Sequence, residues 1–214
     1  GKISYSESDI EGGSITVFQR IDCPQGTPQL QPDFPCKAND DIYLGGAQAS
    51  AVALIDGPTL NGLGVREDEQ LLTTLEMEYD LSDEYTLTAV TGYYDFSEVN
   101  AHNATVGPRA VVLVPFLPFD MTQFTQEVRL TTNYSGDFNF MLGGFYETRE
   151  TSSSQDGILT VFPPAPFAFG TEELSEDQHA YSFFGNVIWD VTDALEISAG
   201  LRYSREEKEL DFVY

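Results

Sequence analysis

The sequence predicts an all-β protein, namely an antiparallel transmembrane β-barrel of which this chain forms a part. Three observations predict this fold: short polar turns, strands that alternate strictly on both sides of each turn, and long connections between the resulting hairpins. The turns lie at residues 81–84, 134–137 and 191–194. Short turns at one end of the strands and long loops at the other are typical of outer-membrane β-barrels.

The strand that leaves each turn has one apolar side that ends in a tyrosine. These sides are Tyr85, Leu87, Ala89, Thr91, Tyr93; then Phe138, Phe140, Leu142, Gly144, Tyr146; then Leu195, Ile197, Ala199, Leu201, Tyr203. The eight steps from the first to the last residue cover roughly 27 Å of strand, or about 20 Å of depth at a tilt near 40°. We therefore expect this side to face lipid.

Aromatic residues at the two ends of these apolar sides predict two membrane girdles. Such girdles flank the lipid-facing band of an outer-membrane barrel. We place Tyr79, Tyr134 and Trp189 in the girdle near the turns, and Tyr93, Tyr146 and Tyr203 in the opposite girdle.

The strands that enter the turns alternate in the same way, with charges on the second side. Glu76, Glu78, Glu127 and Asp190 would face the lumen, where the candidate partners are Arg129 and Arg202 or a plug inside the barrel. Gln126 breaks the apolar side of its strand, which predicts either a bulge there or a position above the lipid. A soluble β-sandwich also alternates, but its strands usually have about five or six residues, whereas these have roughly twelve or more.

The chain is expected to be part of one barrel domain spanning residues 1–214. A first strand ends near Arg20, a loop covers about 21–66, and hairpins cover about 67–99, 120–152 and 177–212. This gives seven strands. Single-chain bacterial barrels have an even number of strands and must close, because an open edge leaves unpaired amides in lipid.

The charge of the chain argues against nucleic acid as a partner. Ten basic residues against 35 acidic residues give a formal net charge of −25. A phosphate backbone would be repelled by this charge, and the sequence has no basic stripe to bind it.

Two cysteines bracket a proline-rich segment in the first long loop. We favour a disulfide between Cys23 and Cys36, which would staple an extracytoplasmic loop, over two free thiols. A zinc site is disfavoured because no second Cys or His pair lies nearby. Carboxylates that suit a hard cation such as calcium occur in and after this loop, without the ordered spacing of a known calcium loop: Asp33, Asp40, Asp41, Glu67, Asp68 and Glu69.

Three segments resemble the barrel of TonB-dependent outer-membrane receptors. They are residues 124–133 (FTQEVRLTTN), 142–146 (LGGFY) and 181–203, in which an aromatic–glycine strand is followed by a DVTD turn and a GLRY strand. The similarity covers about residues 67–210. It implies a 22-stranded barrel with an N-terminal plug domain, but this chain contains neither a plug nor enough strands.

The resemblance also implies a function and partners. Such receptors take up scarce nutrients, for example metal chelates, vitamins or glycans, with energy that reaches the plug through the TonB complex. Outer-membrane lipid, a small-molecule or glycan substrate and a surface lipoprotein are therefore the expected partners, the compartment is the bacterial outer membrane, and no cofactor is expected. A passive porin and a soluble adhesin or interaction domain remain as alternative functions.

Two connections are unusually apolar for solvated loops, at residues 110–119 and 161–170. Such runs are expected to fold over something, either a ligand or other loops. The candidate ligand contacts are Phe116, Phe119, Phe162, Phe167 and Phe169.

An enzyme is not expected. The sequence has no Gly-x-Ser-x-Gly motif, no phosphate-binding glycine loop and no zinc-binding histidine pair. His179 and Ser182 lie three residues apart, which would place them on opposite faces of one strand.

Overall fold

The computed structural model describes residues 1–11, 65–101, 113–159 and 167–213, all of which belong to one antiparallel sheet or its turns. Among these residues there is no helix that could span a membrane. The strands are β1 (Lys2–Glu11), β2 (Val65–Ser82), β3 (Tyr85–Ala101), β4 (Leu113–Thr132), β5 (Phe138–Leu159), β6 (Phe167–Thr192) and β7 (Leu195–Val213).

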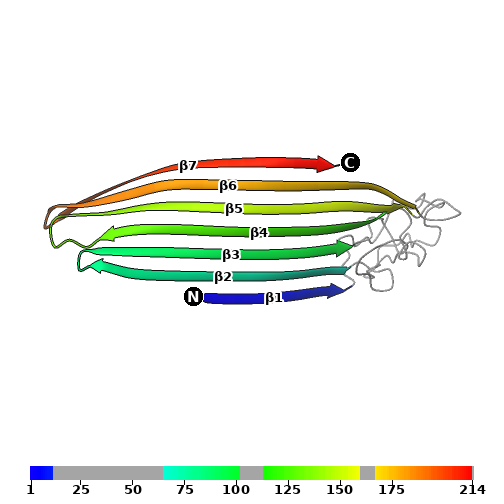
Figure 1. The fold of residues 1–214 in the computed structure, drawn as a ribbon, viewed down its shortest axis with the longest axis horizontal. Coiled ribbons are helices and arrows are strands. Elements are labelled where there is room, and N and C mark those ends of the chain that lie inside the picture. Colours follow the sequence, from blue (N-terminus) through cyan, green and yellow to red (C-terminus); the bar gives the residue numbers. More distant parts are fainter. Residues whose placement is uncertain (12–64, 102–112, 160–166, 214) are drawn as a thin grey trace, which may run out of the picture.

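The strands pair in sequence order, β1 to β7, so that each strand is antiparallel to the next (Figure 1). The short turns β2–β3, β4–β5 and β6–β7 all lie at one end of the sheet, which we call the turn end. The longer connections all leave from the opposite end, which we call the loop end. The predicted fold class is confirmed, and the described part of the chain contains seven strands, as expected.

Side-chain hydroxyls and amides fix the geometry of the short turns. The Ser82 hydroxyl accepts a hydrogen bond from the Glu84 amide at 3.2 Å, and the Thr192 hydroxyl accepts one from the Ala194 amide at 3.3 Å. In the wider β4–β5 turn, the Asn139 side chain bridges both the amide and the carbonyl of Tyr134. These bonds satisfy backbone groups that have no partner in the strand ladder.

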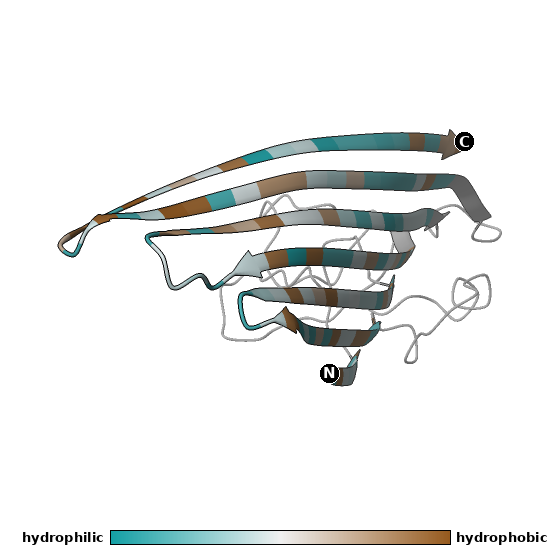
Figure 2. Ribbon diagram, turned by 60° about the vertical axis from the view of Figure 1, so that its left-hand side comes forward, coloured by the Kyte–Doolittle hydropathy of each residue, from teal (hydrophilic) through white to brown (hydrophobic). Residues whose placement is uncertain are grey.

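Hydrophilic and hydrophobic residues alternate along the strands (Figure 2). Because successive side chains point to opposite sides, the two faces of the sheet differ in chemistry. The outer face carries Tyr93, Tyr146 and Tyr203, and most of the large apolar side chains on it are exposed. The inner face carries Arg129, Arg149 and Arg202. Among the described residues, Val65 is the only buried hydrophobic residue. A single sheet without a dry interior differs from the two packed layers of a sandwich.

The strands reach further toward the loop end than the sequence predicts. Residues 113–119 form the start of β4 rather than a loop, and β6 already begins at Phe167. Both segments are rich in residues that favour strands, and both pair with β5. Pro118 is accommodated in β4, although it removes one amide donor from the ladder.

The bulge predicted at Gln126 is wrong. The pairing of β4 with β3 and with β5 continues without a register shift through this residue. Gln126 instead uses its amide locally: its Oε1 accepts a bond from the Thr91 hydroxyl at 2.7 Å, and its Nε2 donates to the carbonyls of Val90 and Glu127. A polar side chain whose groups are all paired fits an otherwise apolar face.

The aromatic residues on the outer face are staggered across the sheet. The cross-strand row that starts at Tyr93 passes through Thr148 on β5 and Glu207 on β7. Tyr146 lies two residues from this row toward the turn end, and Tyr203 lies four residues from it in the same direction. Trp189 is displaced by four residues relative to the row of Tyr79, which passes through Gly185. Both lines therefore shift by one residue per strand.

This stagger corresponds to a definite angle. One residue of about 3.4 Å for each strand spacing of about 4.8 Å gives an inclination of about 35°. Strands of outer-membrane barrels are tilted by about 35–45° from the membrane normal. Each aromatic line therefore runs parallel to the membrane surface only if the strands have the tilt of barrel strands.

Candidate functional site: a cavity at the loop end

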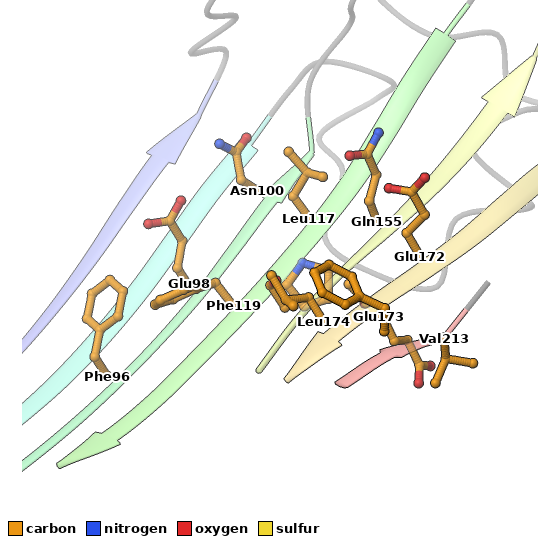
Figure 3. Close-up of a pocket in the computed structure, with 14 residues that line it drawn as sticks. Phe96, Glu98, Asn100, Leu117, Phe119, Gln155, Glu172, Glu173, Leu174 and Val213 are labelled. Atoms are coloured by element: carbon orange, nitrogen blue, oxygen red, sulfur yellow. The ribbon is translucent and has the colours of Figure 1, made fainter. Parts of the chain in front are cut away.

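The main candidate site is a cavity of about 550 Å³ on the inner face, close to the loop end (Figure 3). Five consecutive strands, β3 to β7, contribute to it. Its apolar part consists of Phe96, Leu117, Pro118, Phe119, Leu174, Phe212 and Val213. Its polar part consists of Glu98, Asn100, Ser153, Ser154, Gln155, Glu172 and Glu173.

Strand register brings these residues together from distant parts of the chain. Phe119 lies opposite Glu98 on one side and Ser153 on the other, and the same row continues through Leu174 to Phe212. Because every second residue of each strand faces inward, neighbouring rows add further side chains to the same surface. The cavity is thus built by the sheet itself and not by a single loop.

An aromatic group forms one side of the cavity. The rings of Phe96 and Phe119 meet edge to face, with centroids 6.0 Å apart. Tyr94 stacks on Phe96 with centroids 6.3 Å apart, and its hydroxyl donates to Gln70 Oε1 at 3.2 Å. Such aromatic groups present large, rigid apolar surfaces at a low entropic cost.

Ion pairs hold the polar side chains around and below the aromatic group. Arg66 contacts Glu98 at 2.9 Å. Nearer the turn end, Arg149 contacts Glu176 at 3.1 Å and donates to Gln178, and Lys208 approaches Glu176 at 3.8 Å. These pairs fix the inner surface next to the cavity, whose lining includes Glu172 (Figure 3).

A second inner-face cluster surrounds Arg202. Its guanidinium carbon lies 5.6 Å from the centre of the Phe184 ring and 5.8 Å from that of Phe145. The Phe184 ring in turn lies over Gly143, where any Cβ atom would overlap the ring. The missing side chain of Gly143 therefore allows the aromatic ring and the arginine to pack against the sheet.

The expected pairing of inner-face charges is partly observed. Arg129 contacts Glu127 on its own strand at 3.1 Å. Arg202, which we expected to pair with an acidic residue, is instead stacked on two rings, and its Nε donates to the Ser204 hydroxyl at 3.2 Å. Arg202 stacks in this way because the missing side chain of Gly143 lets the Phe184 ring lie flat enough on the sheet for the guanidinium to contact it.

Of the five phenylalanines singled out from the sequence, Phe119 lines the cavity. Phe116 lies in β4 opposite Ala101, and Phe167 and Phe169 lie in β6 opposite Leu159 and Gly157. Phe162 lies outside the described residues. Sequence reasoning missed Phe96, Leu174 and Phe212. Their parity alone indicates only that they face inward, whereas the register between strands brings them together.

The predicted cysteine pair and part of the acidic group cannot be compared with the structure. Cys23, Cys36, Asp33, Asp40 and Asp41 lie outside the described residues. The group Glu67–Asp68–Glu69 does not form a ligand set, because it lies in β2, where Asp68 faces inward to Arg66. In the described part of the chain, no three His, Cys, Asp or Glu side chains are arranged to hold a metal ion.

The expected girdle residues lie as follows. Tyr79, Tyr93, Tyr146, Trp189 and Tyr203 are all exposed on the outer face. Tyr134 lies in the β4–β5 turn, where its ring meets that of Tyr85 edge to face at 5.5 Å and the two hydroxyls are hydrogen bonded. Their role as a membrane girdle stays a prediction.

The fold and the inner-face cavity define a segment of a large antiparallel barrel. A family model described as TonB dependent receptor-like, beta-barrel, matches residues 29–212. The chain therefore belongs to the TonB-dependent receptor β-barrel family, and the resemblance noted in the sequence is confirmed. Members of this family are outer-membrane receptors and transporters.

This chain spans less than a third of the length of the two solved structures described next. The ferric yersiniabactin uptake receptor FyuA from Yersinia pestis is similar with a TM-score of 0.55 and 15% identity, over 70% of this chain and 22% of that one. BauA, the ferric preacinetobactin receptor from Acinetobacter baumannii, matches with a TM-score of 0.44 and 12% identity, over 79% of this chain and 30% of that one. At such identities, the likeness to FyuA shows the fold alone.

Proposed function

We propose that this chain is the part of an outer-membrane receptor that contacts a scarce nutrient during TonB-dependent active uptake. The observation that carries the proposal is the cavity at the loop end. Five strands of a receptor-family sheet place Phe96, Phe119, Leu174 and Phe212 there, beside Glu98 and Glu172. A concave, largely apolar surface with a few fixed polar groups is the usual form of a small-molecule site.

Membrane placement follows from the outer face. The two staggered aromatic lines are proposed to lie at the two membrane interfaces, with the exposed residues Leu75, Met77, Val128, Leu142 and Leu201 in lipid between them. Their stagger of one residue per strand supports this placement, because it matches the tilt of barrel strands. The loop end, and the cavity with it, would then face the outside of the cell.

The class of nutrient remains a metal chelate, a vitamin or a glycan. The cavity adds one criterion, which is that the ligand should present an apolar or aromatic surface to Phe96 and Phe119. Energy would come from the TonB complex through a plug domain, and a surface lipoprotein is a further candidate partner. A passive porin would transport the same nutrient without TonB, and a soluble adhesin would be extracted without detergent.

The test uses the full-length receptor in cells. A ferric siderophore, a corrinoid vitamin and an oligosaccharide are supplied in turn as labelled ligands, and uptake is compared in strains with and without TonB. We expect TonB-dependent uptake of one ligand, and an affinity loss of about tenfold or more in Phe119→Ser, because burying a phenylalanine side chain contributes about 1.5–3 kcal/mol.

Phe119→Tyr is the matched control, since it retains the aromatic surface, and the amount of each variant in the outer membrane is measured alongside. If none of the three ligands is taken up in a TonB-dependent way, the transport proposal is contradicted for those classes. If uptake occurs but is the same in Phe119→Ser, the cavity does not contact the ligand.

A further inference from the structure

The outer face of the sheet has a hollow of about 550 Å³ over β5, β6 and β7. Small residues lower the surface there, because Gly185 has no side chain and Ala199 has only a methyl group. Larger side chains surround this low region: Leu142, Phe183, Val187, Leu201 and Tyr203. A Cβ atom on Gly185 would lie 2.9 Å from Leu142 Cδ2, so the glycine also allows Leu142 to lean over β6.

The hollow lies between the two aromatic lines of the outer face. On β6 it extends from Val187 to Phe183, and Trp189 follows at the turn end. On β7 it extends from Ala199 to Tyr203, which itself belongs to the aromatic line nearer the loop end. Four residues of strand correspond to about 13 Å, so the hollow is an elongated groove within the proposed lipid-facing band.

We propose that this groove holds one acyl chain of an outer-membrane lipid. The proposal rests on the membrane placement given above and goes beyond it, because it assigns a discrete lipid site on a surface that is otherwise contacted by lipid in general. The exposed Val128 on β4 lies in the same cross-strand row as Phe183, so the groove continues into apolar surface on that side. Its lining residues include no Asp, Glu, Lys or Arg, and both features support an apolar occupant.

The preference for this site comes from its shape. In a membrane, burying apolar surface brings no hydrophobic gain, because lipid tails are as apolar as leucine. What differs between sites is the number of close contacts, each of which contributes a small dispersion energy. A chain in the groove contacts side chains on both sides and the sheet beneath it, whereas a chain on a flat part of the outer face contacts protein on one side.

The projecting walls favour a thin, flexible occupant over a protein surface. Phe183 is 66% exposed although β6 is paired on both sides, and Leu201 stands directly opposite Gly185 on β7, so both rise above the floor formed around Gly185. A strand or helix from another protein would contact these two side chains first and leave the floor uncovered. An acyl chain is narrow enough to lie between them.

The experiment uses the full-length receptor reconstituted in phospholipid bilayers that contain a phospholipid with a diazirine group on its acyl chain. After illumination, labelled peptides are quantified by mass spectrometry in two windows of the outer face. One window is the groove, residues 183–187 and 199–203. The other is the face of β2 and β3, residues 75–79 and 87–91. Ala199→Phe fills the groove, and Ala89→Phe makes the same change on β3.

We expect the groove to be labelled about threefold more than the β2–β3 window, the ratio that a handful of extra atom contacts would produce. Ala199→Phe should bring the ratio to about one, and Ala89→Phe should leave it unchanged. Comparing variants removes differences in the reactivity of individual residues towards the diazirine.

Even labelling of the two windows in the unaltered protein would overturn the proposal, and so would a ratio that Ala199→Phe does not change. Protection of the groove from label together with dimers in the same sample would also overturn it, because a second copy would then be the occupant. Label in neither window would contradict the membrane placement, and the acyl-chain site with it. Each variant is first shown to be folded by its resistance to heating in detergent.

Discussion

At the scale of single residues, two neighbouring glycines in β5 have different roles. Gly143 faces inward, where a Cβ atom would overlap the Phe184 ring on which Arg202 is stacked. Gly144 faces outward, where a Cβ atom would meet its nearest neighbour, Phe183 Cδ1, at an ordinary 3.8 Å. The same substitution is therefore expected to have opposite consequences at adjacent positions.

Gly143→Ala should lower the free energy of unfolding by about 1–3 kcal/mol, the usual cost of overpacking, because the ring and the arginine must move. Gly144→Ala should be neutral or stabilise by up to about 1 kcal/mol, since alanine reduces the freedom of the unfolded chain. Urea unfolding of the full-length receptor in lipid vesicles measures both. Equal effects at the two positions would show that the packing of the Phe184 ring does not require a glycine at position 143.

At the scale of strands, the sequence predicts the elements well because alternation, tyrosine spacing and turn chemistry are local signals. Seven strands, three short turns and the two faces follow from them. The start of β4 was not predicted, because residues 113–119 contain prolines, which usually mark loops. The start of β6 was not predicted either; it contains no proline but directly follows the proline-rich residues 163–166.

Two further features could not be predicted because they depend on the register between strands. The cavity combines Phe96, Phe119 and Phe212 from β3, β4 and β7, and no spacing within one strand reveals that they share a surface. The stagger of the aromatic lines likewise cannot be predicted without the register between strands. Phe119 was singled out because its segment is unusually apolar, and the structure places it in the cavity; its contact with a ligand stays a prediction.

The stagger makes a prediction about depth. Leu87 and Leu142 lie in one cross-strand row with Leu130 between them, but on different strands, β3 and β5. If the strands are tilted, Leu87 lies near the turn-end aromatic line, whose Tyr79 is its direct partner, and Leu142 lies near the middle of the lipid band. Arginine should therefore cost about 2–4 kcal/mol at Leu142 and about 0–1 kcal/mol at Leu87.

The measurement compares Leu→Arg with Leu→Ala at each position, which removes the loss of leucine packing, including the contact of Leu142 with Gly185. Folding free energies are determined in lipid vesicles for all four variants of the full-length receptor. Equal arginine costs at the two positions would mean that the rows run parallel to the membrane, and the tilt inferred from the aromatic residues would be wrong.

At the scale of the whole molecule, the net charge of −25 is unevenly distributed. On the loop-end side of Tyr93, Tyr146 and Tyr203, the outer face carries acidic residues on all strands described: Glu7, Asp9, Glu67, Glu69, Asp95, Asp120, Glu150, Glu173, Asp177, Glu207, Glu209 and Asp211. Several of them are direct cross-strand partners. Asp177 lies between Glu150 on β5 and Glu209 on β7.

Like charges directly opposite each other destabilise a sheet, by a few tenths of a kcal/mol up to about 1 kcal/mol for each pair. Asp177→Asn removes two such contacts at once and should raise the free energy of unfolding by about 0.5–2 kcal/mol at low salt. Added salt shortens the screening distance from about 30 Å at 0.01 M to about 3 Å at 1 M. The unaltered receptor should therefore become more stable as salt is added, and the benefit of Asp177→Asn should fall towards zero over the same range.

Asp193→Asn is the matched control, because it removes the same charge from the β6–β7 turn at the opposite end of the sheet. If the total charge of the receptor were the cause of instability, the two substitutions would stabilise equally. If repulsion between neighbouring strands is the cause, only Asp177→Asn has a large effect, and only its effect depends on salt. Urea unfolding of the full-length receptor at both salt concentrations distinguishes the two cases. Only repulsion between neighbouring strands depends on the register that places Asp177 between two glutamates, whereas an effect of total charge does not.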